Sequence, residues 1–221
     1  MTPPLHFADA REAADLAAFL ARLIHYDRAA AVRLQAGGGA LAVFGRPPSF
    51  EVLAIRTAAL LDDAPLDVTV SAGQLLDGIE ESAGKAMVPD PVTGPPWAGV
   101  LPPRGGWQEA PGLPDAAGLR GAVAAAVAEF RERDTALPAE RRNRAERDRI
   151  GREIWTRTIG ATGLPLRAVH AAQSLGFLPP HDVPVALLAA GSWLRLRTPY
   201  GSIAVRKAGI GPGLTVTPVR T

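Results

Sequence analysis

The chain has no cysteine and few aromatic residues among its 221 residues. Without cysteine it can form no disulfide, use no thiol nucleophile and hold no cysteine-ligated zinc. Only 5% of the residues are aromatic, so a core must be built mainly from Ala, Val, Leu and Ile. Lysine is scarce too, with Lys85 and Lys207 against 22 arginines, which we attribute to GC-rich coding. The 47% of apolar residues still suffices for a packed core.

Long apolar runs and targeting signals are missing as well. No uninterrupted apolar stretch approaches the roughly 18 residues that span a membrane. Residues 1–7 lack a basic segment followed by an apolar run, so no signal peptide is indicated. We therefore expect a cytoplasmic protein that makes no membrane contact.

The sequence also lacks motifs of catalytic or metal sites. None of the four histidines has a partner at the spacing of a helical zinc site. No nucleophile elbow is present, and no glycine-rich phosphate loop precedes a helix. His25 and Asp27 could supply a base and an acid that orients it, but a histidine in the last turn of a helix is explained by the helix dipole. We predict no catalytic residue, no metal site and no cofactor.

Charge is unevenly distributed along the chain, although the net charge is only +2. Residues 1–140 carry 11 basic and 18 acidic groups, whereas residues 141–221 carry 13 basic and 4 acidic groups. A basic third attached to an acidic remainder is typical of proteins that bind a polyanion. Two alternatives remain: the two parts attract each other, or the coding bias scattered arginine along the last third.

The N-terminal unit, residues 1–87, is predicted to hold one helix followed by an antiparallel sheet. Apolar residues at helical spacing indicate a helix over residues 9–25, with Asp9 as its cap and Glu12 at a capping-box position. The pattern then changes to a period of two, which is typical of strands. Four strands are expected, over residues 32–35, 41–43, 52–56 and 66–70. Ser71 is placed to cap a short helix that ends near residue 79.

The C-terminal unit, residues 161–221, repeats this order. A helix is expected over residues 166–175, with Gly176 positioned to end it. Four strands are expected after it, over residues 185–189, 193–197, 203–206 and 214–219. Two short alignments favour a pseudo-repeat: residues 34–37 with 188–191, and residues 46–56 with 197–206. The predicted fold class is α+β, with two helix-plus-antiparallel-sheet units.

A strap rich in proline, glycine and tryptophan, residues 88–114, lies between the units. It holds 8 of the 21 prolines and therefore cannot be a helix or a central strand. We interpret it as an extended segment whose tryptophans cover the apolar edge of a sheet. It could instead be a pocket lid or a polyproline ligand, which makes Trp97 and Trp107 candidate partner-binding residues.

A two-helix insert, residues 115–160, follows the strap. Asp115 should cap the first helix, and the second is expected over residues 139–156. The first half of the second helix is nearly all charged, and Ile150, Ile154 and Trp155 are its apolar anchors. Three acid-first pairs have the favourable i,i+4 spacing: Glu140–Arg144, Asp148–Arg152 and Glu153–Arg157. The charges of this insert are thus explained as a solvated, self-paired face.

The order of helix, helix and basic hairpin in the last third resembles the end of a winged helix-turn-helix domain over about 65 residues. On the short helix, the resemblance implies contacts to base edges from Arg167, His170 and Ser174, with Gln173 beside them. On the hairpin, it implies phosphate contacts from Arg195, Arg197, Arg206 and Lys207. Against it, the trihelical core of that fold is incomplete here, and the strands exceed a minimal wing.

The whole length resembles an uncharacterised family of actinobacterial proteins of about this size that has no assigned activity. Three stretches carry the resemblance: Leu34-Gln35-Ala36-Gly37-Gly38 through Phe44-Gly45-Arg46-Pro47-Pro48, Gly94-Pro95-Pro96-Trp97-Ala98-Gly99, and Leu214-Thr215-Val216-Thr217-Pro218. The resemblance implies a lineage and a length, and no catalytic residue.

We therefore expect a non-catalytic binding protein whose basic C-terminal third contacts nucleic acid or another acidic partner. One alternative is a protein-binding or chaperone-like assembly module, a homodimer included, that uses a sheet edge or the strap. Another alternative is an enzyme of unrecognised type with a pocket under the strap.

Overall fold

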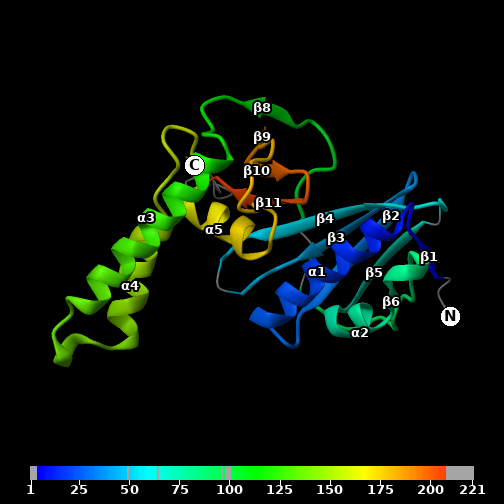
Figure 1. Cartoon of the computed structure of the whole chain (residues 1–221), viewed down its shortest axis with the longest axis horizontal. Coiled ribbons are helices and arrows are strands. Elements are labelled where there is room, and N and C mark those ends of the chain that lie inside the picture. The colour runs from blue at the N-terminus through cyan, green and yellow to red at the C-terminus, as the bar shows by residue number, and fades with distance from the viewer. Residues whose placement is uncertain (1–3, 49, 64, 96, 98–100, 208–221) are drawn as a thin grey trace, which may run out of the picture.

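An eight-stranded antiparallel sheet runs through the protein (Figure 1). The computed structural model describes residues 4–48, 50–63, 65–95, 97 and 101–207. From edge to edge the strands are β5 (Leu66–Ser71), β2 (Ala31–Gly37), β3 (Ala40–Gly45), β4 (Leu53–Ala59), β11 (Gly201–Arg206), β10 (Trp193–Thr198), β9 (Ala186–Ala190) and β8 (Gln108–Ala110). With helices packed on this sheet, the α+β class is confirmed.

The two expected units share this sheet and meet where β4 pairs with β11. The N-terminal unit supplies α1 (Ala10–Tyr26) and strands β2 to β5, and the C-terminal unit supplies α5 (Leu166–Ser174) and strands β9 to β11. The fourth strand on the C-terminal side is β8, which comes from the strap and pairs with β9. The strand expected over residues 214–219 lies outside the described residues.

The arrangement has the symmetry of a repeat, but the alignments made from the sequence are displaced by one residue. Ala54 lies opposite Ile203, and both side chains belong to the core under the helices. Ala204, the residue aligned with Ala54, lies on the other face of the sheet. Because strand side chains alternate between faces, a one-residue shift moves the whole strand pattern to the wrong face.

Helix α1 begins where the sequence predicts. The Asp9 carboxylate accepts hydrogen bonds from the backbone N–H groups of Arg11 and Glu12, which satisfies two donors that the first turn leaves unpaired. The expected capping box is not closed. The Glu12 carboxylate instead accepts a hydrogen bond from Arg56 of β4 at 3.2 Å.

The sheet has a different cover on each face. Helices α1 and α5 pack on one face, which we call the helix face, and together with the sheet they enclose the main core. The strap crosses the other face, which we call the strap face. It runs from β5, where the Val92 N–H donates to the Thr69 carbonyl, to β8 at the opposite edge. Midway along this path, Trp97 is buried against Phe44 and Trp193. The strap therefore covers a face of the sheet, where the sequence suggested an edge.

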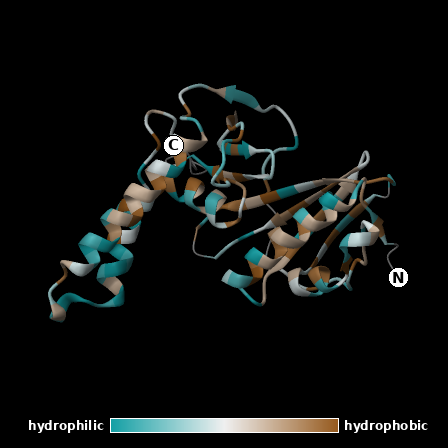
Figure 2. Ribbon diagram, viewed as in Figure 1, coloured by the Kyte–Doolittle hydropathy of each residue, from teal (hydrophilic) through white to brown (hydrophobic). Residues whose placement is uncertain are grey.

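Helices α3 (Ala116–Thr135) and α4 (Arg144–Trp155) form a hairpin that projects from the sheet (Figure 1). Its far end is mostly hydrophilic (Figure 2). As expected, Asp115 caps α3 by accepting from the Gly118 N–H. Helix α4 begins later than predicted, because residues Ala139–Arg141 form a 3-10 turn (η2) and Asn143 is the cap.

The charges of the hairpin pair both between its two sides and within each side. None of the three acid-first pairs expected along α4 is an ion pair in the described part of the chain. Instead, Arg147 donates two hydrogen bonds to Asp134 at 2.7 and 2.8 Å. Arg157 likewise binds Glu129 at 2.5 and 2.8 Å. These hydrogen bonds hold the pKa values of Asp134 and Glu129 below their ordinary range.

Smaller elements close the N-terminal end of the sheet. Strands β1 (Leu5–His6), β7 (Lys85–Ala86) and β6 (Ile79–Glu80) form a three-stranded sheet, and a 3-10 turn, η1 (Glu81–Ala83), joins the last two. Ser71 caps α2 (Ala72–Asp77), as predicted. Among the residues described, no helix is both long enough and apolar enough to cross a membrane.

Candidate anion-binding site

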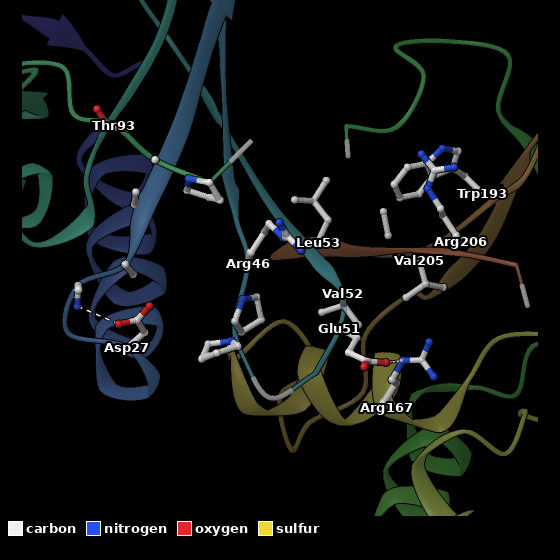
Figure 3. A pocket seen from close by; sticks show the side chains of 18 residues that line it. Asp27, Arg46, Glu51, Val52, Leu53, Thr93, Arg167, Trp193, Val205 and Arg206 are labelled. Atoms are coloured by element: carbon white, nitrogen blue, oxygen red, sulfur yellow. Dashed lines mark hydrogen bonds and ion pairs between the residues drawn. The ribbon is translucent and has the colours of Figure 1, made fainter. Parts of the chain in front are cut away.

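A cavity of about 700 Å³ opens at the end of the sheet where β4 and β11 separate (Figure 3). Ala204 of β11 is the last residue paired on this side, opposite Leu53 at the start of β4. Strand β11 continues for two more residues, to Arg206, while the chain before Leu53 belongs to the loop that connects β3 with β4. The space between that loop and the end of β11 is the cavity.

Three arginines line the cavity, and each comes from a different element. Arg46 directly follows β3, Arg167 lies in the first turn of α5, and Arg206 ends β11. The two acidic residues in the lining are Asp27 and Glu51. The Asp27 carboxylate accepts a hydrogen bond from the Ala29 N–H at 2.9 Å. The lining therefore carries more positive than negative charge.

Arg167 and Glu51 form a loose pair at the base of the cavity (Figure 3). The Arg167 Nε atom lies 3.9 Å from a Glu51 carboxylate oxygen, which is too long for a hydrogen bond. This Nε atom is buried, and no described residue accepts a hydrogen bond from it. The backbone of Glu51 has a φ of 51°, a left-handed conformation that is unusual for a residue with a side chain.

Arg46 and Arg206 line the cavity higher up. Arg46 is exposed and forms no hydrogen bond or ion pair with another described residue; its side chain points into the space between the walls (Figure 3). The guanidinium of Arg206 lies 4.9 Å from the centre of the buried Trp193 ring, a cation–π contact. Arg206 thus reaches the cavity from the strap face, whereas Arg167 reaches it from the helix face.

Three of the predicted phosphate-binding residues share the strap face. Arg195 and Arg197 alternate with inward-facing residues of β10, and Arg206 lies opposite Trp193 on β11. We call Arg195, Arg197 and Arg206 the arginine row. Arg195 is half-buried. Its Nε donates to the Ser202 hydroxyl at 2.8 Å, and its guanidinium lies 5.8 Å from the Trp107 ring. Burial, together with the charge of Arg197, lowers the pKa of Arg195.

The candidate residues of the short helix are not beside this row. Helix α5 packs on the helix face, so His170, Gln173 and Ser174 are separated from the row by the sheet, whereas Arg167 lines the same cavity as Arg206 of the row. His170 is engaged in packing. Its ring stacks on Trp155 at 4.4 Å, and burial lowers its pKa. Gln173 is exposed and Ser174 half-buried. The helix and hairpin do not form the single DNA-contacting surface that the winged-helix resemblance implies.

The remaining candidates lie near the strap. Lys207 is half-exposed, and its backbone N–H donates to the Ser192 carbonyl. Trp97 is buried within the chain, and Trp107 is half-buried with its Nε1 donating to the Pro103 carbonyl at 3.0 Å. A second cavity, of about 570 Å³, lies under the strap and includes Arg195 in its lining.

Sequence reasoning missed two residues of the first cavity, Arg46 and Glu51. Arg46 has no sequence signal of a binding site, because it lies in a proline-rich break between two expected strands. The left-handed backbone of Glu51 has no sequence signal, because this conformation is typical of glycine or asparagine. Within the described residues, no group of three or more His, Asp or Glu side chains is placed to hold a metal ion.

Two family models match consecutive parts of the chain. A domain of unknown function (DUF8010) matches residues 1–99, and a second domain of unknown function (DUF8185) matches residues 102–210. Together the two matches cover most of the chain, and the first ends and the second begins within the strap. Neither description states an activity, which agrees with the expected family of unassigned function. The comparison with curated proteins gives no match.

Among solved structures, the chain is similar to the crystal structure of a DNA polymerase sliding clamp from Pseudomonas aeruginosa. The two share 14% sequence identity with a TM-score of 0.48, over 96% of this chain. The chain spans 66% of the clamp chain. The function proposed below rests on the residues of this chain alone.

Proposed function

We propose that the protein is a non-catalytic binding protein that contacts nucleic acid through the arginine row. The observation that carries this proposal is the placement of Arg195, Arg197 and Arg206 on one face of two paired strands. Alternate residues of a strand lie roughly 7 Å apart on the same face. The row therefore offers successive guanidinium groups along a line, and guanidinium is the side-chain group best suited to pair with phosphate.

Aromatic rings beside the row support the same function. Trp107 and Trp193 each lie against one of its arginines. Arginine side chains combined with aromatic rings are a common feature of surfaces that bind single-stranded nucleic acid, where the charge follows the backbone and the rings contact bases. Trp107 is only half-buried, so part of its ring is accessible beside Arg195.

A gel-shift assay with single-stranded and double-stranded DNA, at low and at physiological salt, tests this function. We expect binding that weakens as salt rises, because bound phosphates release counterions. Arg197→Ala should lower the slope of log affinity against log salt by about 1. Arg144→Ala removes the same charge from the α3–α4 hairpin, where its side chain is 95% exposed, and should leave binding unchanged.

A variant that removes a negative charge, and should therefore strengthen binding, provides a second test. Glu109 of β8 pairs with Leu188, which in turn pairs with Arg195, so Glu109 lies on the strap face two strands away from the row. Glu109→Gln should strengthen binding at low salt, since it removes a negative charge near the bound phosphates. No binding at low salt would overturn the proposal. Arg197-dependent binding to polyglutamate but not to DNA would replace nucleic acid by an acidic protein.

A further inference from the structure

We propose that the cavity between β4 and β11 binds a phosphate monoester through Arg46, Arg167 and Arg206. This inference goes beyond the proposed function, because the arginine row needs only a polyanionic backbone, whereas the cavity brings arginines of three elements around one space. The three guanidinium groups reach the cavity from the loop after β3, from α5 and from β11. A phosphate monoester offers three acceptor oxygens, one for each of these donors.

The lining of the cavity favours an anionic ligand, because it holds three arginines and two carboxylates. Of the two carboxylates in the lining, that of Asp27 already accepts a hydrogen bond from the Ala29 N–H. The other, Glu51, is the one acidic group near the base, and its side chain is 80% exposed. A ligand phosphate can therefore compete with the exposed Glu51 carboxylate for Arg167.

Arg167 has an unsatisfied hydrogen-bond donor at the base of the cavity. Its side chain is only 23% exposed, and its buried Nε has no hydrogen-bond acceptor among the described residues. Buried donors of this kind are normally satisfied. The Glu51 carboxylate stands 3.9 Å away, so it neutralises the guanidinium without forming the hydrogen bond. A phosphate oxygen in the cavity can supply that bond, and the exposed Glu51 side chain is free to give way.

The size of the cavity indicates that the phosphate is attached to a larger group. About 700 Å³ exceeds the needs of a phosphate ion and lies in the usual range for small-molecule sites. Val52, Leu53 and Val205 provide an apolar wall beside the arginines (Figure 3). Arg206 belongs to both the row and the cavity. The phosphate could thus be the end of a nucleic-acid strand lying along the row, or it could belong to a free nucleotide.

The first experiment compares adenosine 5′-monophosphate with adenosine by calorimetric titration of the full-length chain. We expect the monophosphate to bind at least about tenfold more tightly, because charge-assisted hydrogen bonds to phosphate are strong. Arg46→Ala should abolish the difference. Arg46 is exposed and without a partner among the described residues, so this variant should keep the melting temperature of the wild type. Glu51→Gln should increase the affinity for the monophosphate, because it removes the competing charge.

The second experiment identifies the source of the phosphate and separates this inference from the proposed function. It compares one oligonucleotide with and without a 5′-phosphate. Tighter binding of the phosphorylated form that depends on Arg46 assigns the cavity to a strand end. Equal binding of both forms, with Arg46-dependent binding of the mononucleotide, assigns it to a free nucleotide. Arg46-independent affinities in both experiments would overturn the inference. Arg197→Ala tests the row separately and should leave the preference of the mononucleotide over adenosine intact.

Discussion

Arg56 is the most deeply buried charged residue among those described, at 5% exposure. It lies on β4, and its guanidinium donates to Asp15 at 2.9 Å and to Glu12 at 3.2 Å, both on α1. It also donates to the Tyr200 carbonyl at 2.8 Å, in the turn between β10 and β11. One side chain therefore joins the helix of the N-terminal unit to the hairpin of the C-terminal unit.

Removing this side chain should destabilise the whole protein. Arg56→Ala leaves two carboxylates and a carbonyl without their donor, so we expect the free energy of unfolding to fall by about 2–3 kcal/mol. Arg33→Ala is the matched control, since its ion pair with Asp67 is partly exposed and should be worth about 0.5 kcal/mol. Urea unfolding measures the loss of unfolding free energy in both variants. Equal losses in the two variants would contradict the bridging role of Arg56.

His170 should make stability depend on pH. Burial against Trp155 and Phe50 lowers its pKa in the folded state from the ordinary 6.5. Below that value the unfolded chain takes up a proton that the folded chain resists, so stability should decrease as pH falls from about 7 toward 5. His170→Gln should reduce this loss of melting temperature, and the exposed His25→Gln should not. An identical pH profile in wild type and His170→Gln would contradict the prediction.

At the scale of elements, the α3–α4 hairpin is held by two kinds of contact. Ile150 and Ile154 of α4 are fully buried in the main core. Nearer the far end, exposed ion pairs such as Asp134–Arg147 join the helices. The hydrophilic far end and the more apolar base in Figure 2 follow this division.

We expect the apolar contacts to dominate the stability of the hairpin. Ile154→Ala should lower the free energy of unfolding by about 3 kcal/mol, because it opens a cavity in a packed core. Asp134→Asn keeps the shape of the side chain, weakens a partly exposed ion pair, and should lower the free energy of unfolding far less than Ile154→Ala does. Urea unfolding at neutral pH distinguishes the two. A larger loss in Asp134→Asn would show that the ion pairs hold the hairpin.

Sequence patterns predicted the helices and strands whose formation depends only on residues that are close together in the chain. Asp9, Ser71 and Asp115 cap helices as expected, since a cap needs only a side chain and the N–H groups that follow it. The start of α4 was placed too early because Asn143 was overlooked as its cap. Strand β8 was not predicted, because a three-residue edge strand in a proline-rich segment has no periodicity of its own.

At the scale of the whole molecule, the tertiary structure explains part of the charge asymmetry. The division between residues 140 and 141 falls within the α3–α4 hairpin. Acidic residues of α3 lie on one side of it, and the arginines that bind them lie on the other. The alternative in which the acidic and basic parts attract each other therefore holds for the hairpin.

The shared sheet predicts that the halves depend on each other. A fragment of residues 1–99 would leave the β4 edge unpaired and would expose Leu53 and Ile55, which pack beside Trp193 and Ala204 in the full chain. Unpaired apolar edges associate. We expect the fragment to form oligomers in size-exclusion chromatography with light scattering, and to melt below the full chain. A monomeric fragment with the melting temperature of the full chain would contradict this dependence and support independent domains.

The sequence by itself determined the class of the protein, most helices and strands, the covering strap and the absence of known catalytic motifs. Each of these follows from composition, or from residues a few positions apart along the chain. Only the tertiary structure decided that the units share one sheet, that the short helix and the basic hairpin face opposite sides, and that Arg46, Arg167 and Arg206 line one cavity. These features depend on the pairing of β4 with β11 and on which face each side chain takes. A shift of one residue in the strand pairing moves each side chain to the other face of the sheet, and no local sequence pattern specifies this register.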